Sequence, residues 1–278
     1  MNVEQLIQQA KLLLNKNKLE EAKTVFENIL KIEPSHYKTH TNIGAILLKL
    51  EKFKEAMKSF EKAIELNPNF VIAHYNLGIT QAKLNMMDEA EASYKKAIKF
   101  KIDYVEAYIN LGSILLKMDK LVDAEKTFKK TIELKPQFAV AYYNLGCTQE
   151  KMSKFDEARE FMSILPEEIL NEKKIVEISL KLEITEKSSE ASKNFDDFKK
   201  FLEKNPNDIQ AHINLSNALF GVGKISECYS TLIKAIKIDP EWNNQEARRK
   251  LLTFISSHDL ASEEARKARR QLSSILFN

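Results

Sequence analysis

The sequence is poor in the two residues that interrupt helices, with only 6 glycines and 6 prolines among 278 residues. It also lacks an excess of charge of one sign, because 43 basic and 40 acidic side chains leave a formal net charge of +3. Scarce glycine and proline favour a helix-rich protein with short turns. The near balance of charge gives no field that indicates nucleic acid or an anionic membrane surface as a partner.

Cysteines and long apolar runs are scarce as well. Cys147 and Cys228 stand far apart and form no CxxC motif, which argues against a disulfide framework or a thiol redox centre. No apolar run approaches the roughly 20 residues of a membrane-spanning helix. The N-terminal sequence MNVEQLIQQAKLLL has no basic start followed by an apolar core and a cleavage site. We therefore expect a cytoplasmic protein that works without a cofactor.

A strict internal period of 34 residues dominates what the sequence does contain. An asparagine followed by Leu or Ile and then glycine recurs at Asn42–Gly44, Asn76–Gly78, Asn110–Gly112 and Asn144–Gly146. Alanine recurs at Ala22, Ala56, Ala90, Ala124 and Ala158. A bulky side chain recurs at Phe26, Phe60, Tyr94, Phe128 and Met162. Self-similarity of this kind is the signature of a solenoid of helical hairpins.

Each repeat is numbered here so that this glycine takes repeat position 8, and each is predicted to form two helices, A and B. The regular repeats are Val3–His36, Tyr37–Phe70, Val71–Tyr104, Val105–Phe138 and Ala139–Glu172. In the second repeat the pattern predicts helix A over Lys38–Leu50 and helix B over Phe53–Leu66. Pro34, Pro68 and Pro136 share the repeat position at which helix B ends, because proline cannot continue a helix.

Glycine inside helix A needs a packing explanation, because it costs about 1 kcal/mol relative to alanine in helix propensity. Close approach of helix B supplies one. We expect the recurrent alanine of helix B to meet the glycine face. The aromatic ring four residues later is then expected to fill the space between repeats.

With a small residue at repeat position 8, Ala at 20, an aromatic ring at 24 and Pro at 32, residues Val3–Phe161 resemble the tetratricopeptide repeat family. The resemblance implies a right-handed superhelix whose concave groove is lined by the A helices.

The pattern weakens after the fifth repeat. Pro166 is expected to interrupt helix B there, with a joint at Asn171–Lys174. A poorly matched pair follows over Ile175–Asp208, with Leu182 and Asn194 at the small positions and Phe198 and Phe201 on an apolar face.

A good repeat resumes over Ile209–Trp242, with Asn214, Leu215 and Ser216 in place of Asn-Leu-Gly and Cys228 in the alanine position. A last helical pair, broken near Ser257–Ala261, is expected to shield the open end. The predicted fold is an all-α solenoid of about seven hairpins with a capping hairpin. Its predicted segments are residues 1–165, 166–208, 209–242 and 243–278.

A second resemblance covers roughly Ile164–Phe277. The order ILP, KNPND, NALFGVGK, KIDPEW, EARRKLL and ARRQLSSILF is similar to the C-terminal helical tail of the bacterial chaperedoxins. These thioredoxin-like co-chaperones hold unfolded clients and pass them to a chaperonin, on which the tail end docks. This chain has neither the thioredoxin domain nor a CxxC motif, so no redox role is carried over. The resemblance points to partner docking by the basic C-terminal end, at Arg266, Arg269, Arg270 and Phe277.

The strongest binding candidates are the asparagines at repeat position 6, which helical spacing places on the groove side of helix A. They are Asn42, Asn76, Asn110, Asn144 and Asn214. Such a row could hydrogen-bond the backbone of an extended peptide, and it resembles the asparagine ladder of O-linked N-acetylglucosamine transferases. Alternatively, these amides only cap or bridge neighbouring helices.

Other side chains on the same face set the character of the expected groove. Tyr75, Ile79, Ile109 and Tyr143 make its middle moderately apolar, which favours a peptide over nucleic acid. Lys49, Lys83 and Lys117 recur near the end of helix A, either as a basic groove or, as we prefer, as cations that stabilise the helix dipole.

No catalytic or metal site is indicated. His40, His74 and His212 share repeat position 4 with Tyr108 and Tyr142, which makes them packing residues rather than metal ligands. No nucleophile is paired with a base, so we expect no enzyme.

Three functional hypotheses follow. The first is a protein-interaction module that binds an extended peptide or unfolded segment in its groove, in a chaperone pathway. The second is an assembly scaffold that uses its convex side or its ends, and the third is a recruiting partner for a glycosyltransferase.

Overall fold

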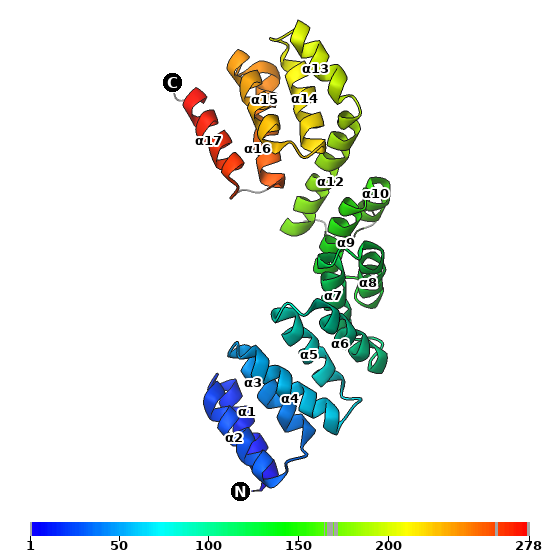
Figure 1. Cartoon of the computed structure of the whole chain (residues 1–278), viewed down its shortest axis with the longest axis vertical. Coiled ribbons are helices and arrows are strands. Elements are labelled where there is room, and N and C mark those ends of the chain that lie inside the picture. Colours follow the sequence, from blue (N-terminus) through cyan, green and yellow to red (C-terminus); the bar gives the residue numbers. More distant parts are fainter. Residues whose placement is uncertain (1, 164, 166–168, 170–171, 259–260, 277–278) are drawn as a thin grey trace. The chain divides into compact units, whose positions relative to one another are not determined.

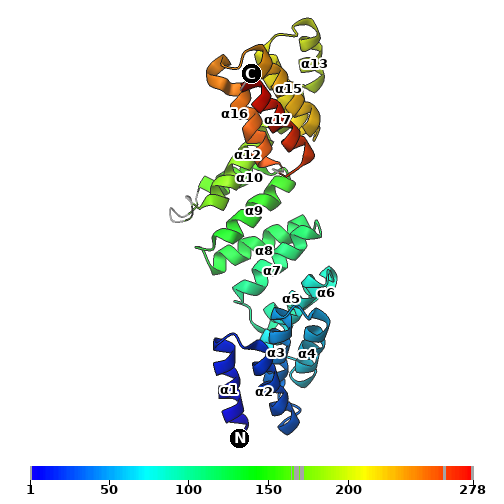
Figure 2. The same cartoon turned by 90° about the vertical axis from the view of Figure 1, so that its left-hand side faces the viewer.

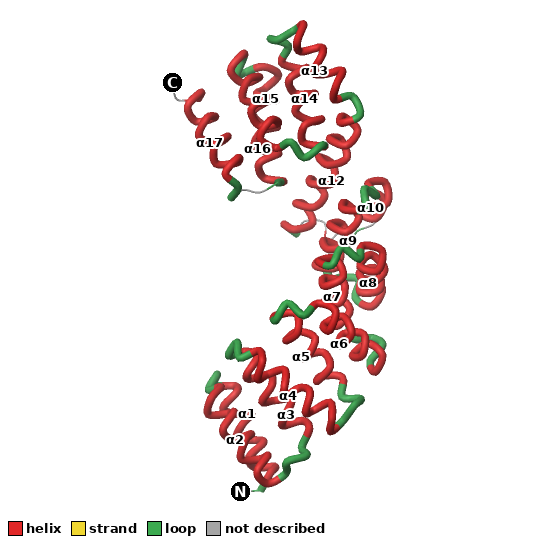
Figure 3. Tube along the Cα trace, viewed as in Figure 1, coloured by secondary structure: helices red, strands yellow, loops and turns green. Residues whose placement is uncertain are grey.

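A computed structural model describes residues 2–163, 165, 169, 172–258 and 261–276. Pro166, Asn171 and Phe277, to which roles are assigned above, lie outside the described residues, as does the side chain of Met162. Within the described residues, the regular secondary structure is entirely helical (Figure 3). The predicted all-α class is therefore confirmed.

The chain forms two compact units, Met1–Thr148 and Gln149–Asn278, whose boundary falls within helix α9. The helices of the first unit are α1 (Val3–Asn15), α2 (Leu19–Ile32), α3 (Tyr37–Lys49), α4 (Phe53–Leu66), α5 (Val71–Lys83), α6 (Met87–Phe100), α7 (Val105–Lys117), α8 (Leu121–Leu134) and most of α9 (Ala139–Lys151) (Figure 1). Those of the second are α10 (Phe155–Ser163), α12 (Lys173–Ser192), α13 (Phe195–Lys204), α14 (Ile209–Gly221), α15 (Ile225–Ile238), α16 (Trp242–Ser257) and α17 (Glu263–Leu276).

In the first unit each helix from α1 to α7 packs against the next one along the chain, as the turned view of α1 to α4 shows (Figure 2). The A helices of successive repeats also touch, because α3 contacts α5 and α5 contacts α7. Helix B of the second repeat has the predicted bounds, Phe53–Leu66, and helix A begins and ends one residue earlier than predicted, over Tyr37–Lys49. The stack of helical hairpins is confirmed.

A residue in the left-handed backbone conformation follows every regular A helix. Positive φ values occur at the same repeat position in all five regular repeats, at Asn17, Glu51, Asn85, Asp119 and Ser153. The next N–H group bonds to the carbonyl five residues earlier, as from Lys52 to Leu47 at 2.9 Å. This is the Schellman arrangement, which satisfies carbonyls that the helix end would otherwise leave free. It fixes a tight turn between helix A and helix B.

Three of the recurrent glycines, Gly44, Gly78 and Gly112, receive the aromatic rings of helix B. A Cβ atom built on Gly78 would lie 2.7 Å from the ring of Tyr94, and one on Gly112 would lie 2.5 Å from the ring of Phe128. The expectation that alanine meets the glycine face therefore needs correction, because the nearest atoms belong to the ring. That ring packs within its own repeat, and the alanines, such as Ala90, are fully buried beside it.

Side chains at repeat position 4 bind the carbonyl group that closes the preceding repeat. The Nε2 atom of His74 lies 2.7 Å from the carbonyl oxygen of Pro68, and the hydroxyl of Tyr142 donates to that of Pro136 at 2.9 Å. The same contact, six residues back in the chain, joins His40 to Pro34 and His212 to Pro206. These histidines are thus hydrogen-bonded links between repeats, a role more specific than the predicted packing.

The second unit departs from the repeat pattern in α12, which runs for 20 residues, whereas the regular A helices have 13. Asn194, predicted to lie at the small position inside helix B, instead lies in the turn before α13. The close helix contact occurs at Gly221, where a Cβ atom would clash with the carbonyl oxygen of the buried Ser188. Phe201, expected on an apolar face, is 49% exposed, and Leu202 takes the buried position.

The C-terminal hairpin covers α15. Helices α16 and α17 both contact α15, and Ala265, Ala268 and Leu272 of α17 are buried in that core. The predicted break is confirmed, since α16 ends at Ser257 and α17 begins at Glu263.

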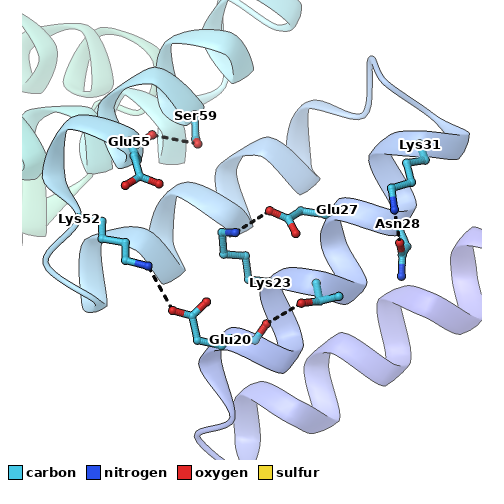
Figure 4. A network of polar contacts seen from close by, with 9 residues as sticks. Glu20, Lys23, Glu27, Asn28, Lys31, Lys52, Glu55 and Ser59 are labelled. Carbon is cyan, nitrogen blue, oxygen red and sulfur yellow. Dashed lines mark hydrogen bonds and ion pairs between the residues drawn. The ribbon is translucent and has the colours of Figure 1, made fainter.

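Ion pairs bridge neighbouring repeats at the start of the B helices. The ammonium of Lys52 lies 3.3 Å from Glu20 of the preceding repeat (Figure 4), and that of Lys120 lies 2.8 Å from Glu91. Lys120, more than Lys95, holds the pKa of the Glu91 carboxyl below its usual value. Exposed pairs contribute only about 0.2–1 kcal/mol each, so they support a stack that apolar packing holds together.

We expect Gly112→Ser to reduce the free energy of unfolding by about 1–3 kcal/mol, because its side chain would overlap the ring of Phe128. The repeat Ile209–Trp242 carries Ser216 and Leu232 at these two positions. The double variant with Phe128→Leu should therefore be more stable than the sum of the two single losses predicts. Urea denaturation of the three variants tests this, and strict additivity would contradict the packing.

Burial lowers the pKa of His74, with Lys96 acting in the same direction and the bond to Pro68 opposing it. The unfolded chain therefore takes up the proton more readily, and stability present above about pH 6.5 is lost as the pH falls below that value. We expect His74→Tyr to weaken this loss, because the tyrosine hydroxyl can reach Pro68 as Tyr142 reaches Pro136. Urea midpoints at pH 7 and pH 5 measure it, and an unchanged pH dependence would contradict the assignment.

Candidate functional site

The A helices of the first unit keep one face free of the core. In α5 the buried side chains are Ala73, His74, Leu77, Thr80 and Gln81. Tyr75, Asn76 and Ile79 are half-buried on the other side of the helix, and Lys83 is exposed in its last turn. Because α3, α5 and α7 contact one another in order, their free sides form one face, which we call the A face.

The asparagines at repeat position 6 differ in how their amides are used. Asn42 is exposed, and Asn76 and Asn144 are half-buried. Among the described residues, these three amides make no hydrogen bond with another part of the chain. Asn110 donates to the hydroxyl of Tyr75 at 3.1 Å, which joins α7 to α5. The ladder therefore combines amides without a hydrogen bond to another described residue with one, at Asn110, that bridges neighbouring helices.

Three tyrosines surround the bridge. The ring of Tyr75 lies 4.9 Å from that of Tyr104 and 6.0 Å from that of Tyr94, measured between centroids. Burial raises the pKa of Tyr104 to about 12, helped by Tyr75 and Glu106, and it raises the pKa of Tyr75 and Tyr94 as well. All three phenols therefore stay neutral near pH 7. Tyr75 and Tyr104 are half-buried and can donate and accept hydrogen bonds while offering apolar ring surface, whereas Tyr94 is only 2% exposed and belongs to the core.

Tyr104 was not predicted to lie beside this face. The signal for Tyr104 was an aromatic side chain at the last position of several repeats, where His36, Phe70 and Phe138 also stand. Tyr94 belongs to the ladder of bulky residues, which indicated only core packing.

The remaining predicted members of the A face lie as follows. Ile79 and Tyr143 are half-buried, but Ile109 is only 8% exposed and belongs to the core. The cations Lys49, Lys83 and Lys117 are exposed in the last turns of α3, α5 and α7, where they can stabilise the helix dipole.

The candidates of the second unit are separate from these. Asn214 on α14 accepts a hydrogen bond from Gln210 at 3.0 Å, so its amide oxygen is engaged. On α17, Arg266 and Arg270 are exposed, and the Nε atom of Arg269 donates to the carbonyl of Ala265 at 3.3 Å.

Neither metal binding nor membrane crossing finds support in the described residues. No group of three or more His, Cys, Asp or Glu side chains there is arranged to hold a metal ion. None of the helices described is both long and apolar enough to traverse a bilayer. The thiols of Cys147 and Cys228 are not joined in a disulfide.

The bond between Tyr75 and Asn110 should contribute about 0.5–1.5 kcal/mol to stability, because both groups are partly shielded from water. We expect Tyr75→Phe to lower the free energy of unfolding by that amount in the wild-type chain. In an Asn110→Ala background the same change should cost far less. A double-mutant cycle by urea denaturation measures the coupling, and equal losses in both backgrounds would show that the amide does not hold the phenol.

Solved structures share this architecture. A tetratricopeptide repeat protein from Parabacteroides merdae is 17% identical, with a TM-score of 0.58 and coverage of 91% of this chain and 98% of that chain. The protein pilF of Pseudomonas aeruginosa is 14% identical, with a TM-score of 0.55 and coverage of 97% of each chain. MamA from Desulfovibrio magneticus is 19% identical, with a TM-score of 0.56, and the match covers 62% of this chain and 97% of that chain. At these identities the likeness shows the fold alone.

The repeats themselves match known family models. Models described as tetratricopeptide repeats match residues 6–36, 37–70, 71–104, 105–138, 127–160 and 188–277. None of these models describes an enzyme. A search of curated proteins finds no match. Because the matched repeats cover well over half of the sequence, the chain belongs to the tetratricopeptide repeat family.

Proposed function

We propose that the protein is a non-enzymatic interaction module that holds an extended segment of a partner protein along the A face of its first unit. The observation that carries this proposal is the pair of free amides on α3 and α5. Asn42 and Asn76 stand at the same repeat position on helices that contact each other, and neither amide is bonded to another described residue.

An amide side chain suits this task because it offers an acceptor oxygen and two N–H donors. It can therefore pair with the N–H and C=O groups of an extended backbone whatever side chains that backbone carries. Tyr75 and Ile79 beside Asn76 add partly exposed apolar surface for the partner's side chains. The bond from Asn110 holds the Tyr75 ring in place, which reduces the entropy lost on binding.

Recognition of backbone rather than sequence favours an unfolded or extended client. A co-chaperone role is the finer form of the proposal, with the arginines of α17 as the docking end for a chaperonin. It is supported by the resemblance of the C-terminal sequence to the chaperedoxin tail and by the exposure of Arg266 and Arg270.

The test uses a permanently unfolded probe, reduced and carboxymethylated lactalbumin carrying a fluorophore, titrated with the whole chain. We expect the double variant Asn42→Ala/Asn76→Ala to bind about 5- to 150-fold more weakly, because each of the two lost hydrogen bonds contributes about 0.5–1.5 kcal/mol. Fluorescence anisotropy gives the dissociation constants, and thermal unfolding confirms that the variant is folded.

A matched control variant carries Asn28→Ala on α2 and Asn69→Ala in the turn before α5. It should bind the probe as tightly as the wild type does. Unchanged affinity in the Asn42/Asn76 variant would contradict the proposal. If the Arg269→Glu/Arg270→Glu variant lost binding of the probe while the Asn42/Asn76 variant kept it, the protein would instead be a scaffold that binds through its C-terminal end.

A further inference from the structure

The turn that joins α6 to α7 departs from its counterparts in sequence but not in backbone shape. The other three turns from a helix B to the next helix A in the first unit carry proline at their second position, as Pro34, Pro68 and Pro136. Here that position holds Ile102. The Tyr104 N–H bonds to the carbonyl of Lys101 at 3.2 Å, and the Phe70 N–H bonds to that of Asn67 at 3.1 Å in an equivalent turn. Proline suits this position, so the turn itself does not require an isoleucine.

The core does not require this isoleucine either. Ile102 is 76% exposed, and Phe100, two residues earlier, is 38% exposed. The Phe100 ring lies 5.6 Å from the ring of the buried His74, measured between centroids, which holds it against α5. Ile72, in the first turn of α5 and thus at the same end of this helical hairpin, is 48% exposed. We call these three exposed apolar residues, Ile72, Phe100 and Ile102, the apolar tip of the third repeat.

Lysines accompany the apolar tip without an equal number of acidic side chains. Residues 95–102 contain four lysines and no acidic residue, whereas the corresponding segment of each other repeat before α9 contains glutamate. Lys95 pairs with Glu91. Among the described residues, no carboxylate oxygen lies within 4 Å of the ammonium groups of the other three, which are Lys96, Lys99 and Lys101. The segment is therefore strongly basic, and the next acidic residues, Asp103 and Glu106, lie on the α7 side of the turn.

The two adjacent repeats neutralise the same positions. Lys62 and Glu65 form an ion pair at 2.7 Å on α4, and the equivalent residues of α8 form one at 2.8 Å. The third repeat carries Lys96 and Lys99 at these positions, so neither cation has a partner there. Burial lowers the pKa of His74, and the charge of Lys96 adds to this effect, which indicates that this cation lies near the ring beneath Phe100. The near balance of charge over the whole chain conceals this local excess.

We propose that the apolar tip and its lysines dock the protein on an anionic lipid surface. Ile102 and Phe100 enter the boundary between headgroups and acyl chains, and the lysines pair with the anionic headgroups around them. Exposed apolar side chains flanked by lysines are the pattern of segments that bind at membrane interfaces. A protein partner would need an apolar hollow and acidic groups in one fixed arrangement, whereas an anionic bilayer offers both at any point of its surface.

This inference goes beyond the proposed function and does not rest on it. The amides of Asn42 and Asn76 do not belong to the apolar tip, and the lysines of α6 do not belong to the A face. A chain that docks on lipid through the tip can still hold a partner along the A face. The two proposals can therefore fail separately.

The first test is co-sedimentation of the whole chain with vesicles of phosphatidylcholine, alone or mixed in equal parts with phosphatidylglycerol. The wild type should prefer the anionic vesicles and bind them less as salt is added. The variant Lys99→Glu/Ile102→Pro carries the residues of the adjacent repeats at both positions, so it should fold. It should bind about 25-fold more weakly or less, because each unit of charge near an anionic surface changes affinity about fivefold. The control Lys58→Glu/Val122→Ala, which changes exposed residues outside the tip, should bind like the wild type.

A second test measures insertion of the tip. Ile102→Trp places a tryptophan there, and the one native tryptophan, Trp242, belongs to the second unit. Vesicles that contain brominated phosphatidylglycerol should quench the fluorescence of this variant much more strongly than that of the wild type. Such quenching requires the side chain at position 102 to reach the acyl chains.

Each other outcome overturns the inference. Equal binding to both kinds of vesicle, no binding to either, or undiminished binding by Lys99→Glu/Ile102→Pro would show that the tip does not dock on anionic lipid. Quenching of Ile102→Trp no stronger than that of the wild type would show that the tip does not enter the bilayer. Binding of polyglutamate or DNA at the tip without binding of vesicles would assign the surface to an acidic macromolecule. If thermal unfolding showed that the double variant does not fold, Ile102→Ser would replace it, because this side chain lies outside the core.

Discussion

The contact between a glycine of helix A and an aromatic ring of helix B is the interaction on which the rest of the structure depends. A side chain at Gly78 would occupy the space of the Tyr94 ring, so the two helices of a repeat can approach this closely only because the glycine has none. The ring is buried on that surface, and the fully buried alanine four residues earlier leaves helix B free to pack. Burying a large aromatic side chain in each of the first four repeats supplies much of the free energy that stabilises the stack.

Further constraints follow from this packing. The A helix must end abruptly, and the Schellman turn at positions such as Asn85 provides that end. The start of the next repeat must be fixed relative to the last B helix, and the bond from His74 or Tyr142 to the preceding proline carbonyl provides that link. With one face of helix A committed to the ring and another to the neighbouring A helix, the remaining face is free for a partner. The proposed function follows from this division of surfaces.

Much of this could be predicted from the sequence, because a repeat makes each interaction visible several times over. The period of 34 residues located the helices of the second repeat to within one residue. Periodicity shows where a small residue is needed but not which atom fills the space, so the partner of the glycines was assigned to alanine instead of the ring. The left-handed position was overlooked because Asn17, Glu51, Asn85, Asp119 and Ser153 differ in type, although they share one spacing.

Prediction was weakest where the period fails. The extended α12 displaced the expected positions, so that Asn194 lies between helices, and no repeat pattern could indicate the pairing of Ser188 with Gly221. At the A face, the asparagine ladder located the side of helix A that the core leaves free. The tyrosine cluster around Asn110 needed the structure, because Tyr94 and Tyr104 come from other positions of the repeat.

The central claim is that the A face of the first unit holds an extended chain, and site-specific photocrosslinking tests it most directly. A photoreactive benzoylphenylalanine would replace Ile79 on the A face or, in a separate variant, Val122 on helix B, which is 70% exposed. The account predicts crosslinks to an unfolded polypeptide from position 79 and few from position 122. Equal crosslinking from both positions, or crosslinking from position 122 alone, would contradict it.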